Sequence, residues 1–223
     1  MSARVIEIMI ESFWKILLPG LIYTIPLAVV SFAIGLVIAL FTAIAQVSKT
    51  PVLGQISRLY VWIFRGTPLL VQLYIIFYGL PGAGIMIDPI PAAIIALSLN
   101  VGSYASESVR AAILSIPTGQ MEAGYCAGLT YWQTMYRIIL PQAFRVAFPT
   151  LGNSFINLIK ETSLTANITV MEMFRATQKI VANTYEPLAL YCEVAFIYLI
   201  FCTVLSRFQS LGEKKLSAKM VVK

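Results

Sequence analysis

Long apolar runs divide most of the chain into five segments, each close to the roughly 20 residues that a helix needs to cross a bilayer. The third and fourth runs also carry polar residues in their middle parts. We therefore predict an all-α integral membrane protein whose five transmembrane helices form a single domain over residues 1–223. The predicted spans are residues 21–45, 60–80, 90–114, 138–159 and 188–211.

A short amphipathic segment precedes the first apolar run. Residues 5–18 place apolar side chains at helical spacing, and Glu7, Glu11 and Lys15 follow one another four residues apart on another face. This pattern predicts a separate helix that lies along the membrane interface.

Residues 115–137, between the third and fourth runs, are too polar and too broken to cross lipid. Thr118 is placed to cap a first short helix, and Gly128 is placed to end it, because glycine adopts the left-handed conformation at least cost. Thr130 and Gln133 have the spacing of a capping box that opens a second helix. The segment is predicted to form a helix-turn-helix; the alternative is an amphipathic connector on the lipid surface.

Composition supports the membrane assignment and narrows the chemistry. Hydrophobic residues make up 59% of the chain and charged residues 12%, and the mean hydropathy is +0.83. There is no histidine, and the three cysteines lack CxxC spacing, so histidine-based hydrolytic and zinc sites are excluded and no metal site is expected. No nucleophile and base are placed for catalysis, so we expect no enzyme and no catalytic residue.

The positive charges indicate orientation, because cytoplasmic loops are enriched in lysine and arginine. An amino terminus outside and a carboxyl terminus in the cytoplasm put most basic residues on the inner side, and the net charge of +6 needs no nucleic acid to explain it. The inner residues are then Lys49, Arg58, Arg110, Arg137, Arg145, Arg207, Lys214, Lys215, Lys219 and Lys223.

The polar segment also carries a longer motif that continues into the fourth run. It resembles the EAA motif of permease subunits from bacterial ABC importers, with glycine at position 124 where the usual pattern has alanine. The matching residues are Glu122, Ala123, Gly124, Gly128, Ile138, Leu140 and Pro141.

Other segments resemble the polar amino acid branch of these permeases. They include RGTP at residues 65–68, LPQA at 140–143 and LIKETSL at 158–164. Within that branch, YTIPL at residues 23–27 and LNVGSYASE at 99–107, together with DPIP at 88–91, look most like L-cystine permeases.

The resemblance implies a type I importer permease in a bacterial inner membrane. It implies that residues 115–137 are a cytoplasmic coupling loop that docks on ABC ATPase subunits, and that the chain pairs with a second permease copy or a homologue. An extracytoplasmic amino-acid-binding protein would deliver substrate; residues 161–185 are a candidate contact for it or a gate helix. The chain has no GxxxxGK[ST] sequence, so ATP and Mg²⁺ are expected on the partner subunit and no cofactor on this chain.

Ionisable and amide side chains within spans are costly in lipid and indicate function. One face of the third span carries Asn100, Tyr104 and Glu107, and the fourth span has a similar polar stripe. We predict that the two stripes face each other and bound a hydrated path for a zwitterionic amino acid. The path residues are Gly66, Thr67, Asn100, Asn153, Asn157, Lys160 and Glu161.

Structural roles remain open for several of these residues. Glu107 and Arg110 can form a surface pair, Lys160 and Glu161 can snorkel to the interface, and Arg65 can anchor a span end. Residues 66–68 can be a plain helix interruption.

Other substrates and another class also stay open. Glutamine, arginine or histidine is the alternative to cystine, although Ser154 stands where permeases for cationic amino acids often have a carboxylate. A stand-alone secondary transporter is the alternative class; it predicts internal repeats, which the chain lacks.

Overall fold

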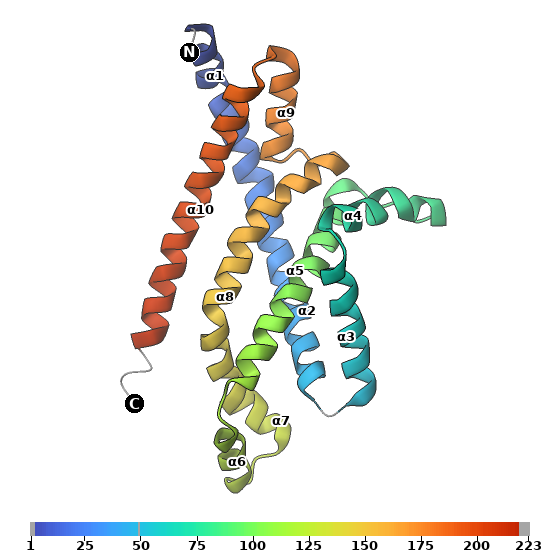
Figure 1. Ribbon diagram of the computed structural model, residues 1–223, viewed down its shortest axis with the longest axis vertical. Coiled ribbons are helices and arrows are strands. Elements are labelled where there is room, and N and C mark those ends of the chain that lie inside the picture. Colours follow the sequence, from blue (N-terminus) through green and yellow to red (C-terminus); the bar gives the residue numbers. More distant parts are fainter. Residues whose placement is uncertain (1–2, 49, 219–223) are drawn as a thin grey trace.

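The computed structural model describes residues 3–48 and 50–218, and every regular element in these ranges is a helix (Figure 1). Three helical stretches, Ala3–Val47, Pro89–Leu114 and Pro187–Leu216, are long and apolar enough to cross a membrane. The bent pair Pro51–Gly66 and Leu69–Ala83 makes a fourth if it is one span. Lys49, Lys219 and Lys223, which were assigned to the inner side, lie outside the described residues.

The amino-terminal segment does not form a separate interfacial helix, so that prediction was wrong. α1 (Ala3–Pro19), η1 (Gly20–Thr24) and α2 (Ile25–Val47) continue as one helix. η1 is a π-helical turn between Pro19 and Pro26, and the Ile25 amide donates to the Gly20 carbonyl five residues back. Because proline lacks an N–H and its ring crowds the preceding turn, this wider turn lets the helix continue.

The centre of the fold is the crossing of α2 with α5 (Pro89–Leu114) (Figure 1). The predicted helix at residues 90–114 is confirmed. A Cβ atom on Gly35 would collide with the Val101 side chain, and one on Gly102 would lie 3.1 Å from the Gly35 carbonyl oxygen. The two backbones approach this closely because both positions lack a side chain.

The second apolar run is broken rather than straight. α3 (Pro51–Gly66) ends before Pro68, and the chain resumes as α4 (Leu69–Tyr74), η2 (Ile75–Gly79) and η3 (Leu80–Ala83), bent by 104° from α3. Thr67 is extended (φ −124°, ψ 145°), as the residue before a proline prefers. The predicted span at residues 60–80 is thus interrupted at residues 66–68, where the sequence left a helix interruption open.

The remaining long helices, α8 (Leu140–Glu161) and α10 (Pro187–Ala218), cover the predicted fourth and fifth runs. α8 packs against both α5 and α10, although α8 is not among the helices that are apolar enough to cross a membrane by composition alone. Its Ala143, Ala147 and Leu151 are buried in a cluster with residues of α2 and α5.

A separate bundle forms where α1 meets α9 (Met173–Thr184) and the start of α10, next to the turn η5 (Thr162–Ile168) (Figure 1). Glu172 is fully buried here and caps α9: its carboxylate accepts from the amides of Phe174 (2.8 Å) and Arg175 (2.6 Å) and from the Tyr198 hydroxyl (3.2 Å). The amide of Met173 donates to the Thr24 hydroxyl at 3.3 Å. One carboxylate thus joins α9 to α10, and the next residue joins α9 to the first helix.

Burial raises the pKa of the Glu172 carboxyl to about 7 from 4.5, although its three hydrogen bonds oppose the rise. The folded state therefore holds this proton more tightly than the unfolded state. The resulting stabilisation is complete below pH 4.5 and is lost as the pH rises through about 7.

We expect the melting temperature of the detergent-purified protein to fall between pH 5 and pH 8, and Glu172→Gln to flatten that fall. The raised pKa lowers the free energy of unfolding by ~3 kcal/mol across this pH range. Thermal unfolding followed by circular dichroism measures the effect. Glu11→Gln is the control, because the Glu11 side chain is 67% exposed; an identical pH slope in the Glu172 variant and its parent would contradict the assignment.

Candidate functional site

The polar segment between α5 and α8 forms the predicted helix-turn-helix, with one correction at its start. α6 (Thr118–Cys126) has Pro117 at its cap position, so Thr118 is the first helical residue and caps nothing. Gly128 has a φ of +77°. Its amide bonds the Tyr125 carbonyl (2.9 Å) and the Leu129 amide bonds the Gly124 carbonyl (3.0 Å), a Schellman ending that uses the left-handed glycine.

The second helix begins at the predicted capping box. The Gln133 amide donates to the Thr130 hydroxyl (3.4 Å), and the Thr130 amide donates to the Gln133 side chain (2.9 Å). This helix is not short, however: α7 (Tyr131–Thr134) runs through the π turn η4 (Met135–Ile139) directly into α8. As at Pro26, the wide turn comes just before a proline, here Pro141, so the helix continues through it.

Gly124 is where the two helices of this segment touch. It is buried, and a Cβ atom there would overlap the methyl group of Thr134 and lie 2.5 Å from its hydroxyl oxygen. The residue that departs from the family pattern is therefore matched to a close local contact. The other motif residues divide into the exposed Glu122, Ala123, Gly128 and Pro141 and the half-buried Ile138 and Leu140.

A polar cluster surrounds the break between α3 and α4. The Gln72 amide nitrogen donates to the carbonyls of Phe64 (2.9 Å) and Thr67 (3.0 Å) and lies 2.9 Å from the Thr67 hydroxyl. Its amide oxygen accepts from Asn100 of α5 at 2.9 Å. Gln72 was not among the predicted path residues; a glutamine in an apolar run just after RGTP was the signal that could have found it.

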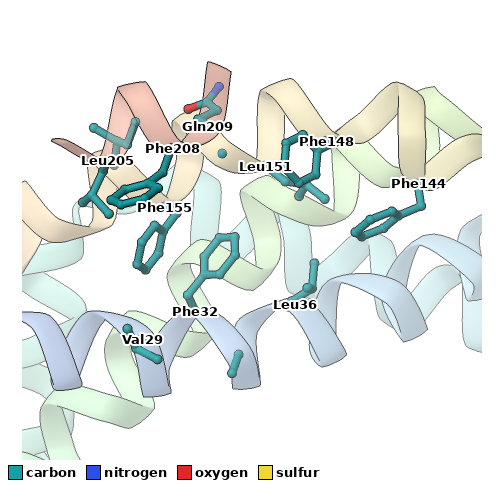
Figure 2. Close-up of a pocket in the computed structure, with 13 residues that line it drawn as sticks. Val29, Phe32, Leu36, Phe144, Phe148, Leu151, Phe155, Leu205, Phe208 and Gln209 are labelled. Atoms are coloured by element: carbon teal, nitrogen blue, oxygen red, sulfur yellow. The ribbon is translucent and has the colours of Figure 1, made fainter. Parts of the chain in front are cut away.

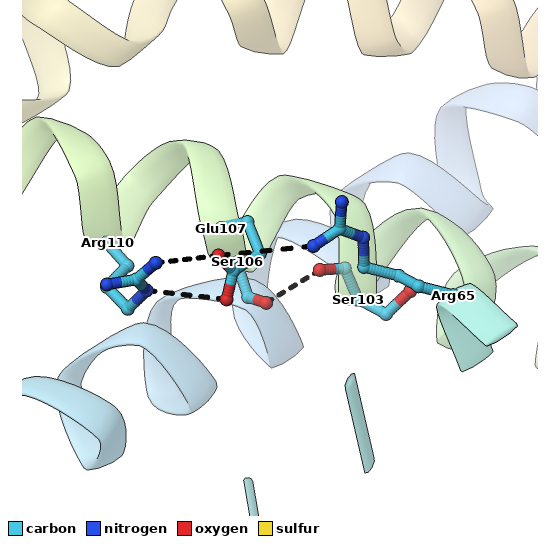
Figure 3. A network of polar contacts seen from close by, with 5 residues as sticks. All are labelled: Arg65, Ser103, Ser106, Glu107 and Arg110. Atoms are coloured by element: carbon cyan, nitrogen blue, oxygen red, sulfur yellow. Dashed lines mark hydrogen bonds and ion pairs between the residues drawn. The ribbon is translucent and has the colours of Figure 1, made fainter. Parts of the chain in front are cut away.

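Figure 3 shows the charged residues of α5, Glu107 and Arg110, together with Arg65 from the end of α3. Arg110 binds Glu107 with two nitrogens, at 2.8 and 3.3 Å, so the predicted surface pair forms. Arg65, at the end of α3, reaches the same carboxylate at 4.0 Å and lies over the Tyr104 ring, 5.3 Å from its centroid. Arg65 therefore connects α3 to α5 rather than standing alone as an anchor at a span end.

The two predicted polar stripes do not face each other within the chain, so that prediction was wrong. Asn100 is buried against Gln72, whereas Asn153 and Asn157 are exposed and Asn153 lies 3.3 Å from the Gln209 nitrogen of α10. α8 turns its alanine and leucine face to α5 instead, because small side chains let the two helices pack closely. The structure brings together Gly66, Thr67 and Asn100 but leaves Asn153 and Asn157 apart from them.

Two of the cavities lie along α8, one beside its middle and one at its carboxyl end. One, of about 530 Å³ between α2, α8 and α10, is lined by Phe32, Phe155 and other apolar side chains, so it offers almost no partners for a zwitterion (Figure 2). The other, of about 460 Å³, includes Lys160, Ser163 and Tyr198. Glu161 is half-buried beside it. In the described ranges, no group of three or more Cys, Asp or Glu residues could hold a metal ion.

Residues 35–218 match the family of binding-protein-dependent transport system inner membrane components. The chain belongs to this family. It is 54% identical over 207 residues to the L-cystine transport system permease protein TcyB of Bacillus subtilis, covering 92% of this chain and 88% of that protein. It is 38% identical over 193 residues to the glutamine transport system permease protein GlnP of Escherichia coli, covering 86% and 88%.

Solved structures agree with this family. An amino acid ABC transporter crystallised with histidines has a chain with 32% identity and a TM-score of 0.87, covering 96% of this chain and all of the other. The MetNI methionine ABC transporter in an inward-facing form shares the fold, with a TM-score of 0.71 at 20% identity over 97% and 99% of the two chains. The chain is thus a transmembrane subunit of an ABC transporter, with the type I permease fold, and an inner membrane component.

We expect Gly124→Ala to destabilise this permease by about 1–3 kcal/mol, the usual cost of forcing a methyl group into a packed contact. The double variant Gly124→Ala/Thr134→Ala should recover most of the loss, because it removes both overlapping atoms and the Thr134 hydroxyl has no hydrogen-bond partner to lose. Thermal unfolding in detergent measures both variants. A double variant as unstable as the single one would contradict this packing.

Proposed function

We propose that the chain is the translocation subunit of an ATP-driven importer for L-cystine. Its amino terminus lies outside and its carboxyl terminus in the cytoplasm. A second copy or a homologue completes the path, two ABC ATPase subunits bind ATP and Mg²⁺ and hydrolyse the ATP, and an extracytoplasmic binding protein delivers the amino acid. The observation that carries the substrate is the 54% identity, over 92% of the chain, to a permease named for L-cystine.

The rigid ending of α6 supports a coupling role for residues 115–137. Gly128 and the Thr130 capping box fix the angle between two helices, and Glu122 and Ala123 stand exposed on the first of them. A rigid exposed helix can transmit a push from a partner, whereas a flexible loop would absorb it. The motif residues Glu122 to Pro141 are therefore proposed to dock on the ATPase.

The exposed polar residues support a second permease subunit beside α8. Amide and charged side chains are costly against lipid and are tolerated where protein or water covers them. Asn153, Asn157 and Lys160 are all exposed on α8. A neighbouring subunit on this side would supply the protein or water-filled surroundings that they require.

The substrate needs donors for its carboxylates and acceptors for its ammonium groups. In the proposed path, Lys160 and the backbone around Gly66 and Thr67 serve as donors, because ammonium and amide N–H groups bind carboxylates well. Asn153, Asn157 and Glu161 serve as acceptors, whereas Asn100 lies buried behind the path against Gln72. These roles rest on chemistry and position: Asn153 and Asn157 are exposed, Glu161 is half-buried, and Gly66 and Thr67 are exposed at the bend of the chain.

We predict that Glu122→Lys abolishes uptake and separates ATP hydrolysis from transport without affecting folding, because Glu122 is exposed. Gly128→Asp should also abolish uptake. The left-handed conformation at this position costs a non-glycine residue about 1–2 kcal/mol, so the substitution should distort the turn between α6 and α7. Uptake and ATP hydrolysis by the complex in proteoliposomes measure both effects. Gly119→Ala, also on α6 and facing open space, is the control; normal transport by either charged variant would refute the coupling role.

For the substrate, we expect unlabelled cystine to compete with labelled cystine in the same proteoliposomes, while glutamine, arginine and histidine do not. Competition by glutamine, arginine or histidine at similar concentrations would replace the cystine assignment by a broader one. The relative named for glutamine makes that amino acid the most informative competitor.

A further inference from the structure

The bend between α3 and α4 creates backbone groups that need partners. A helix end leaves its last carbonyls without intrahelical donors, and in a membrane protein such groups cannot be left to lipid. Two of the last carbonyls of α3 are satisfied by side chains: Ile63 accepts from the Thr67 hydroxyl at 2.8 Å, and Phe64 accepts from Gln72.

Gln72 occupies an unusual position under this bend. Residues 65–68 are exposed, but Gln72 is only 5% exposed and lies beneath them. Its amide nitrogen holds Phe64 and Thr67, and its amide oxygen holds Asn100, which is also 5% exposed. A single buried side chain therefore uses its donor end for the bend and its acceptor end for α5.

A second contact ties the same bend to α5. Arg65 reaches Glu107, two turns along α5 from Asn100, and lies over Tyr104 between them. The Tyr60 hydroxyl adds a 2.6 Å bond to the Leu99 carbonyl of α5. The end of α3 and the bend are thus held to α5 over about two turns of that helix. α5 continues through Ser115 and Pro117 into α6.

We propose that Gln72 and Asn100 are positioning residues that lock the bend at residues 64–68 to α5, so that the bend moves with α5 when the ATPase displaces α6. The lock also fixes the Thr67 hydroxyl and carbonyl in the transport path. This inference rests on the proposed coupling role of α6 but not on which amino acid is transported.

The two ends of the lock can be removed separately. Asn100→Ala removes the bond to α5 and leaves the bend closed by Gln72. Gln72→Glu keeps an acceptor for Asn100 but removes the donors to Phe64 and Thr67, because a carboxylate only accepts. Each variant should lower uptake per ATP hydrolysed by about tenfold, since each leaves buried polar groups unpaired.

The double variant Gln72→Leu/Asn100→Leu separates positioning from simple stability. Gln72→Leu alone leaves the Asn100 amide without its acceptor as well as the Phe64 and Thr67 carbonyls without their donor, and the second substitution removes that unpaired amide. We therefore expect the double variant to have a melting temperature at least as high as that of Gln72→Leu while uptake per ATP remains low. Parent-like uptake per ATP in this double variant would overturn the proposal, because the pair would then serve folding alone.

A reporter at Leu73 tests the lock without any transport assay. Leu73 lies on α4, is fully buried and belongs to the same apolar cluster as Ala96 and Leu97 of α5. With Cys126, Cys192 and Cys202 replaced by serine, Leu73→Cys reacts with a maleimide when α4 moves away from α5 and from η5, which also packs on α4. Asn100→Ala should speed this labelling about tenfold in the assembled complex.

Two controls make the labelling result decisive. Ser98→Ala removes a buried hydroxyl of α5 that has no hydrogen-bond partner, and it should leave the rate unchanged. Leu190→Cys reports on a buried position of α10 in another cluster, where Asn100→Ala should have no effect. If Asn100→Ala accelerates labelling equally at Leu73→Cys and Leu190→Cys, or at neither, the lock is overturned. A parent complex that takes up no cystine would count against the proposed substrate and not against the lock.

Discussion

The close crossing of α2 and α5 is the contact on which the rest of this permease depends. At Gly35 and Gly102 the backbones of the two helices meet without an intervening side chain, and Ala28, Ala39 and Ala105 are buried on these helices. Packing of small residues brings helices together in a membrane, where lipid supplies no hydrophobic drive for association. Because α2 holds α5 in place, the coupling segment at residues 115–137 and the bend between α3 and α4 are both attached to the same fixed helix.

α5 connects those two regions in different ways. At its carboxyl end the chain passes directly into α6, whose side packs through Gly124 against the start of the next long helix. Midway along, α5 carries Asn100 and Glu107, which hold the bend between α3 and α4. The proposed coupling segment and the proposed path residues Gly66 and Thr67 are therefore attached to one rigid helix rather than to separate loops.

Local rules predicted the parts of this structure that local chemistry decides. The capping box at Thr130, the left-handed Gly128 and the helix at residues 90–114 follow from short-range spacing and were confirmed. Two predictions failed where tertiary packing decides. The segment before Pro19 packs against α9 and α10 and continues the first long helix. The polar stripe on α8 points away from α5 because an apolar face of α8 packs there instead.

The bend within residues 60–80 is a different case. Hydropathy counts apolar residues but does not register the geometry that Pro68 imposes on Thr67, so hydropathy predicts the span and only the proline indicates that it can be interrupted. Hydropathy also gave no reason to single out Gln72, because it counts this residue only as one polar residue in an apolar run. Its importance appears only when its two ends are seen to serve α3 and α5 at once.

The most direct test of this frame is a distance within one chain of the assembled transporter. Spin labels at Gly119 on α6, which faces open space, and at Val71 on α4, which is 45% exposed, can be compared without nucleotide and with ATP bound. If α5 carries both regions as one body, the distance between the two labels stays the same in complexes where only one subunit carries both of them. Distances between subunits, measured in complexes with one label on each subunit, should change. A change in the distance within the subunit when ATP binds would show that the bend moves independently of α5 and would contradict the proposed mechanism.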